Sequence, residues 1–212
     1  NNNDEKIWAI LAETQIANKL NKEALESLKR GKEINPQMSE LHFAESSIYL
    51  TEKSYIKAKK AIKKGLKIQP DNATAIFQLG NIYLIELKYN EAIKMFTEAI
   101  DLKKDFWQAL NNIGLSYFEL DEFELSKKYF ERALSFEKNA EPLLGLAASI
   151  QNEDQKRAIS LTKEALYLDP KYVSKKYREE QLWGKKIQKA TNKLFTIKEL
   201  KKDINFAKQY LN

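Results

Sequence analysis

A repeat of about 34 residues is the feature that most constrains how this 212-residue chain can fold. Small residues mark its phase at intervals of 34 positions, at Ala24, Ala58, Ala92 and Ser126. A fifth mark, Ala158, follows after 32 residues, and prolines at 36, 70 and 170 close units at the matching place. A period of this length indicates stacked supersecondary units, because one unit alone cannot bury its apolar face.

The residues between these marks have the spacing of two amphipathic helices in each unit. In the central unit the marked positions are Leu79, Gly80, Tyr83, Tyr89, Ala92, Phe96 and Ala99. This pattern resembles the tetratricopeptide repeat (TPR), a helix-turn-helix unit of the same length. The first unit also carries the family's tryptophan, as Trp8, whereas the later units have His42, Ile76, Leu110 and Leu144 at that position.

The resemblance implies an all-α fold, a right-handed α-solenoid of about five TPR helix-turn-helix units with C-terminal capping helices. We place the five units at about 5–38, 39–72, 73–106, 107–140 and 141–170, and the basic capping helices at 171–212. Within the caps we expect one long helix from Tyr172 to Phe195. A last helix then begins at a capping box formed by Thr196 and Glu199. Residues 179–184 also resemble the tails of some TPR proteins of cyanobacteria and chloroplasts.

Two of the expected first helices are unusual, since 73–85 and 107–118 contain no charged residue. A surface helix normally carries charges on its wet side, so amides and aromatics there favour a recognition surface. In TPR proteins the first helices line a groove that binds extended peptides or partner helices. The resemblance assigns to this groove the residues that face away from the second helices. They are Phe43, Ser47, Thr74, Phe77, Gln78, Asn81, Gln108, Asn111, Asn112, Leu115 and Ser149.

An alternative explanation of the amides is structural, namely that they cap helix ends or hydrogen-bond one another across repeats. The family's carboxylate clamp, which holds a chaperone's acidic C-terminus, is absent because its basic positions correspond to Ala9, Thr74 and Gln78. We therefore predict a non-catalytic protein-protein interaction scaffold that binds a protein segment, in an assembly or chaperone-like role.

The positive charge is concentrated at the C-terminal end of the chain. Residues 171–212 contain twelve Lys/Arg and four Asp/Glu, although the whole chain has a formal charge of only +6. A second hypothesis is therefore an adaptor that docks on an anionic membrane or an acidic partner through 171–212. The lysines between 57 and 67 are interpreted as a solvated face, so no nucleic-acid partner is expected.

The sequence offers little for chemistry at a catalytic or metal site. There is no cysteine and a single histidine, His42, which lies at a packed position of the repeat. We expect no catalytic, cofactor or metal site.

No apolar run reaches the roughly 18 residues of a membrane span. We expect a soluble chain of an intracellular or plastid-like compartment, with room for a targeting segment before Asn1; its oligomeric state stays open.

Overall fold

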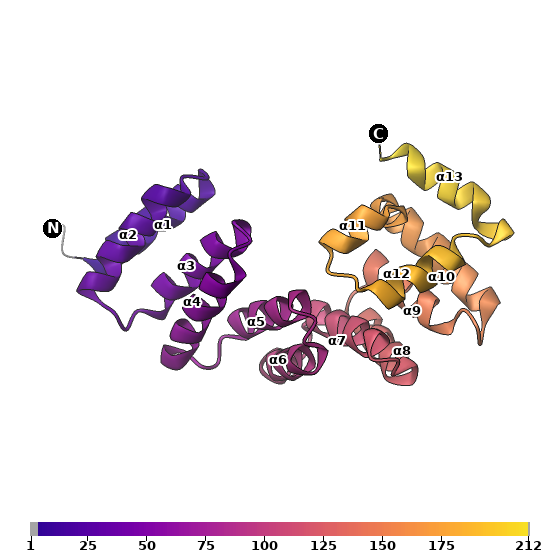
Figure 1. Cartoon of the computed structure of the whole chain (residues 1–212), viewed down its shortest axis with the longest axis horizontal. Coiled ribbons are helices and arrows are strands. Elements are labelled where there is room, and N and C mark those ends of the chain that lie inside the picture. The colour runs from indigo at the N-terminus through magenta and orange to yellow at the C-terminus, as the bar shows by residue number, and fades with distance from the viewer. Residues whose placement is uncertain (1–3, 212) are drawn as a thin grey trace. The chain divides into compact units, whose positions relative to one another are not determined.

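The computed structural model describes residues 4–211, and over that range every regular element is a helix (Figure 1). Ten helices follow the repeat in chain order: α1 (Glu5–Ala17), α2 (Asn21–Ile34), α3 (Ser39–Thr51), α4 (Tyr55–Ile68), α5 (Ala73–Ile85), α6 (Tyr89–Leu102), α7 (Trp107–Glu119), α8 (Phe123–Phe136), α9 (Ala140–Ile150) and α10 (Gln155–Leu168). The all-α helix-turn-helix class is confirmed. The division into five repeats stays a prediction.

The chain divides into two compact units, one up to Ile82 and one from Tyr83 onward. In the first unit α1 packs on α2 and α3 packs on α4; in the second, α7 packs on α8 and α9 on α10. The periodic small residues lie inside the helix packing, since Ala24, Ala58, Ala92, Ser126 and Ala158 are all fully buried. Ser126 also donates a hydrogen bond to the carbonyl of Gly114, at 2.9 Å.

The turn within each of the first four repeats has one residue in the left-handed region of φ. These residues are Lys19, Lys53, Leu87 and Asp121, again 34 positions apart, with φ between 55° and 64°. After each of them, a backbone N–H reaches a carbonyl five residues back, for example from Ser54 to Tyr49 at 2.8 Å. This geometry terminates a helix and reverses the chain in a few residues. The repeat is therefore visible in the backbone as well as in the sequence.

The region after Pro170 differs from the expected single long helix. It forms a 3₁₀ turn η1 (Pro170–Val173), α11 (Lys175–Glu180) and α12 (Lys185–Leu194). The prediction of one helix from Tyr172 to Phe195 is wrong because Leu182 adopts a left-handed φ of 64° and ends α11. A new helix starts only after Gly184. The apolar residues Val173, Trp183, Ile187 and Leu194 of this region all belong to the core of the second unit.

The predicted capping box is also wrong. A 3₁₀ turn η2 (Lys198–Leu200) leads into α13 (Lys201–Gln209), and Ile197, which precedes η2, makes no side-chain capping bond. The Thr196 hydroxyl donates instead to the carbonyl of Lys193 at 2.7 Å, so it closes the end of α12. Helix α13 packs against α10 and η1. It therefore covers the last helix pair, as a terminal cap of a repeat array must.

A buried arginine holds the pieces of the C-terminal segment together. The Arg178 side chain is fully buried, and its guanidinium donates to the Gln188 side chain at 2.9 Å and the Asn192 side chain at 2.7 Å. It also donates to the carbonyl of Tyr172. Burial lowers the pKa of Arg178 to about 10, so the group stays charged at neutral pH. One of the twelve C-terminal cations is thus an interior contact.

The Phe130 ring of α8 is clamped between two glycines of the neighbouring first helices. A Cβ atom on Gly145 of α9 would lie 2.6 Å from the ring, and one on Gly114 of α7 would lie 2.9 Å from it. Phe130 is fully buried and cannot turn away into solvent. Both positions therefore need glycine for space, because neither has a positive φ.

We expect Gly145→Ala to destabilise the protein by about 1 to 3 kcal/mol through overpacking, despite the higher helix propensity of alanine. Gly31→Ala is the matched control. A Cβ on Gly31 would meet the terminal methyls of Leu41 at 3.1 Å, which can shift, and the Cβ of Trp8 at 3.3 Å, and both contacts are longer than those at Gly145. Urea denaturation measures both changes. An equal or smaller loss for Gly145→Ala would contradict the clamp.

Candidate functional site

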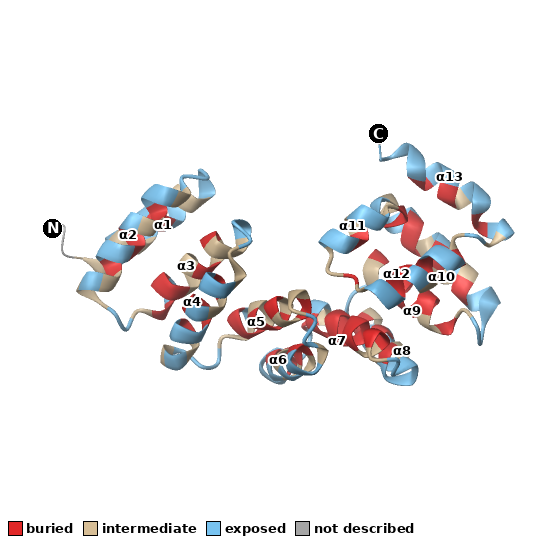
Figure 2. Ribbon diagram, in the orientation of Figure 1, coloured by how far each residue is buried: buried red, intermediate tan, exposed pale blue. Residues whose placement is uncertain are grey.

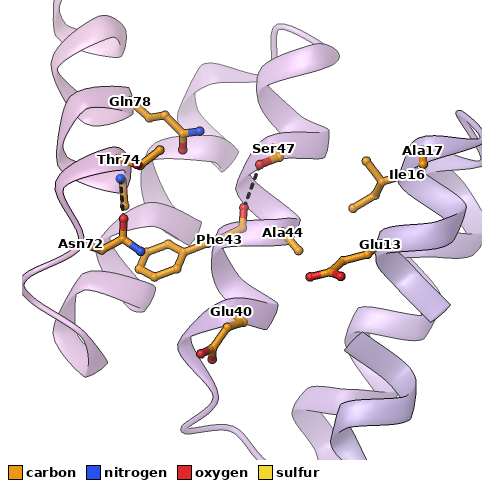
Figure 3. Close-up of a pocket in the computed structure, with 11 residues that line it drawn as sticks. Glu13, Ile16, Ala17, Glu40, Phe43, Ala44, Ser47, Asn72, Thr74 and Gln78 are labelled. Carbon is orange, nitrogen blue, oxygen red and sulfur yellow. Dashed lines mark hydrogen bonds between the residues drawn. The ribbon is translucent and has the colours of Figure 1, made fainter. Parts of the chain in front are cut away.

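A groove in the first unit is formed by α1, α3 and the beginning of α5 (Figure 3). Its cavity volume is about 540 Å³. Four predicted groove residues line it, namely Phe43, Ser47, Thr74 and Gln78. The other lining residues are Glu13, Ile16, Ala17, Glu40, Ala44, Asn72 and Ala75. The structure thus brings together predicted residues from two successive repeats and adds a third helix, α1.

The floor of the groove is apolar and closely packed. The Phe43 ring lies over Gly65 of α4, where any Cβ atom would overlap it. In Figure 3 the ring extends toward Asn72 and Thr74, whereas Ala44 and Ile16 face each other between α3 and α1. Phe43 is therefore partly a core residue, and its replacement would change stability as well as the groove.

Some polar side chains of the groove already have internal hydrogen-bond partners, and others do not. The Asn72 side chain accepts from the backbone of Ala75 at 2.9 Å, and the Ser47 hydroxyl donates to the Phe43 carbonyl at 3.1 Å. Thr74 is exposed and Gln78 half-buried, and neither side chain has a hydrogen-bond partner among residues 4–211. These two groups can therefore bond a ligand backbone without breaking an internal contact.

The residues of α1 that line the groove are not among those predicted from the sequence. Glu13 stands 34 positions before Ser47 and 68 before Asn81, so the repeat interval itself points to it. Two other predicted residues, Phe77 and Asn81, are half-buried and do not line this cavity. Their role in binding stays a prediction.

Three of the four predicted groove residues on α7 do not lie on an open surface. Asn111 is 0%, Leu115 1% and Asn112 8% exposed, and α7 is buried nearly all round (Figure 2). The expected exposure is wrong because α12 packs across α7 and α9. The Asn111 amide donates to the Asn112 side chain at 3.2 Å. This contact joins neighbouring residues of one helix, whereas the structural alternative expects amides that cap helix ends or bond one another across repeats.

The carboxylate of Glu119, at the end of α7, holds the N-terminus of α12. It accepts from the backbone of Ile187 at 2.9 Å and from that of Lys186 at 3.2 Å. A side chain at Gly184 would overlap the Glu119 side chain. These N–H groups have no partner inside their own helix, and the helix dipole favours a negative charge there. Lys186 additionally forms an ion pair with Asp121.

A second buried polar contact joins α9 to the same segment. The Trp183 ring N–H donates to the Glu141 carboxyl at 3.0 Å, and the side chains of Asn111 and Tyr172 also hydrogen-bond this group. Burial raises the pKa of Glu141 to about 7, against the opposing effect of these three donors. The carbonyl oxygen of the Asn111 side chain has no partner among the described residues. Trp183 itself is 4% exposed.

The last two predicted residues lie at the rims of separate cavities in the second unit. Gln108 is exposed, beside Trp107 and Glu141, on a cavity of about 420 Å³. Ser149 donates to the Gly145 carbonyl at 2.9 Å and lines a cavity of about 630 Å³ beside Lys189.

The one histidine is a packed residue, as expected. His42 is 7% exposed, and its Nε2 lies 3.3 Å from the Pro36 carbonyl oxygen. Burial lowers the pKa of His42, so the neutral ring is favoured.

Within residues 4–211, no group of three or more potential ligands is arranged to hold a metal ion. In the same range, no helix is long and apolar enough to cross a membrane.

Removal of the Glu119 carboxylate should loosen the C-terminal segment. We expect Glu119→Ala to cost about 1 to 3 kcal/mol, because backbone donors lose a buried partner. Asp121→Asn removes the charge of an exposed ion pair, keeps a side chain that tolerates the left-handed φ of this turn, and should cost about 1 kcal/mol or less. Amide hydrogen exchange measures the effect locally, at Lys186 and Ile187. Unchanged protection of these amides in Glu119→Ala would contradict the contact.

The Glu141 carboxyl should make stability depend on pH. Its folded-state pKa of about 7 lies above the ordinary value of 4.5, so the folded protein binds more protons between these values. The stabilising contribution is complete below about pH 4.5 and is lost as the pH rises to about 7. Glu141→Gln should therefore match the wild type near pH 4.5 and exceed its urea midpoint at pH 8. A wild type that is the more stable protein at pH 8 would contradict the shift.

Comparison with known proteins places this geometry in a family. The tetratricopeptide repeat model matches residues 39–72, 73–106 and 108–139. No curated protein sequence matches the chain.

Solved structures share the fold at low identity. YrrB, a TPR protein with an unusual peptide-binding site, has a TM-score of 0.70 at 14% identity, over 85% of this chain and 94% of that chain. MamA of Desulfovibrio magneticus RS-1 has a TM-score of 0.70 at 17% identity, over 77% and 94%. The pilF protein of Pseudomonas aeruginosa has a TM-score of 0.65 at 18% identity, over 97% of both chains. With its matched repeats and its helix pairs, this chain belongs to the tetratricopeptide repeat proteins.

Proposed function

We propose that this protein is a non-catalytic scaffold that binds an extended peptide or a partner helix in the groove of α1, α3 and α5. The observation that carries the proposal is the difference between the two units. The first has a cavity of about 540 Å³ lined by four predicted groove residues. In the second, the corresponding residues Asn111, Asn112 and Leu115 are buried, and α12 of the C-terminal segment packs on α7 and α9.

The chemistry of the groove fits a segment recognised mainly through its backbone. Thr74 and Gln78 offer a hydroxyl and an amide, which can both donate and accept. Ile16, Ala44 and Phe43 offer apolar surface beside them. Clefts that bind a ligand commonly combine an apolar lining with a few fixed polar groups. An assembly or chaperone-like role would require such a site, and it remains part of the proposal.

The alternative, docking on an anionic membrane or acidic partner through 171–212, has weaker support. Several of its cations already have internal partners. Arg178 is buried, Lys186 pairs with Asp121, and Lys193 donates to the Asn152 side chain at 3.3 Å. Burial of Arg178 and the ion pair of Lys186 reduce the charge that the segment can offer to another surface, whereas Lys193 keeps its charge beside a neutral amide.

The proposal predicts that peptide binding depends on the first unit. A display library of random linear peptides is panned against the full chain, and the tightest peptide is labelled for fluorescence anisotropy. Gln78→Ala should weaken its binding by about 0.5 to 1.5 kcal/mol through loss of a hydrogen bond. Thr74→Trp should block binding, because the larger ring fills the groove from an exposed position.

Gln108→Ala is the matched control, since it removes the same amide from an exposed position of α7. It should leave the affinity unchanged. Melting temperatures of all variants separate loss of binding from loss of folding. Binding that depends on Gln108 but not on Gln78 or Thr74 would reject this site.

A further inference from the structure

We propose that the α1/α3/α5 groove selects a cationic segment, in which one or two lysine or arginine side chains accompany apolar ones. The inference rests on the proposed function, because it names the partner class for the same site. It begins from the charges that the groove presents.

Two carboxylates are the only charged side chains that line the groove, Glu13 from α1 and Glu40 from α3. Glu13 is exposed and has no hydrogen-bond or ion-pair partner among residues 4–211. Figure 3 shows its carboxylate reaching from α1 toward Ala44 of α3. Glu40 accepts from the Ser39 hydroxyl at 3.1 Å but has no cation partner in the described chain. Both carboxylates are therefore available to a ligand.

Neither α3 nor α5 supplies a cation to neutralise these two groups, and the one lysine of α1, Lys6, does not line the groove. Helix α5 has no charged residue, and α3 contains Glu40 and Glu45 but no lysine or arginine. Glu45 already pairs with Lys32 of α2 at 2.8 Å. Five of the six lysines of α4 line another cavity, beside the exposed Ile56. The site thus has a single sign of charge, and complementarity favours a positive ligand and disfavours an acidic one.

The uncharged lining of the groove indicates that the bound segment also carries apolar side chains. Ile16, Ala17, Ala44 and Ala75 provide a small-residue apolar surface next to Glu13. A polycation without apolar side chains would leave this surface exposed to water. Its binding would then depend only on electrostatic attraction that is screened by salt. A segment that carries both kinds of side chain uses both parts of the site.

The first test is the composition of the selected peptides and the effect of changing their charge. The library peptides should be enriched in lysine and arginine. Replacing these residues by glutamine in the tightest peptide should weaken its binding to the full chain. We expect Glu13→Gln and Glu40→Gln each to weaken the parent peptide about two- to fivefold, as for an exposed ion pair. The glutamine-substituted peptide should respond to neither variant.

Glu26→Gln of α2 is the control, because it removes an exposed carboxylate that does not line the groove. Its affinity should equal that of the wild type. If neutral or acidic peptides bind as tightly, or if both groove variants leave the affinity unchanged while Gln78→Ala lowers it, the charge selection is wrong and the peptide site stands. If no peptide depends on Gln78 or Thr74, the site itself is rejected and this inference fails with it.

Discussion

The carboxylate of Glu119 accepts hydrogen bonds from the backbone of Lys186 and Ile187, and so fixes the first turn of α12 against the end of α7. The contact is favourable for the carboxylate and for the helix, since the helix N-terminus carries unpaired N–H donors and a partial positive charge. Gly184 allows the close approach, because any side chain there would overlap Glu119. The Trp183 bond to Glu141 then ties the same segment to α9. Two charged residues of the repeats thereby hold a segment that lies more than 40 residues further along the chain.

The consequence is a difference between helices that occupy the same place in their repeats. Helix α7 is buried on nearly every side, whereas α3 buries one stripe and shares a groove with α1 and α5. The difference does not come from the repeats, which place small residues and turns at the same interval throughout. It comes from α12, which packs on α7. The Asn111 and Asn112 amides of α7 are therefore part of the protein interior, whereas the Gln78 amide of the first unit can hydrogen-bond a ligand.

Much of the fold follows from local pattern. The repeat interval predicts the small residues at the helix contacts, and Ala24 and Ala158 are fully buried as it requires. The groove residues Phe43, Ser47, Thr74 and Gln78 also follow from helical geometry, because a period of 3.6 residues decides which side faces away from the partner helix. These predictions need only the sequence of one repeat and its neighbours.

The exposure of Asn111 and Asn112 could not be predicted in this way. The repeat pattern identifies a face but not a distant segment that covers it. The break in the expected C-terminal helix has the same origin, since Gly184 is explained by Glu119, 65 residues earlier. A glycine inside a predicted helix is a signal of close approach, but the sequence alone does not say to what. The contribution of Glu13 could have been found from the repeat interval.

The central claim is that the groove of the first unit is open to a ligand and the corresponding face of α7 is closed. Chemical-shift mapping by NMR tests it most directly, with the isotopically labelled full chain titrated with a selected peptide. The account predicts shifts concentrated around Glu13, Phe43 and Gln78, with the amides of Lys186 and Ile187 unchanged. Shifts concentrated on α7, α9 and residues 181–190 would show that the peptide displaces the C-terminal segment, and would contradict the account.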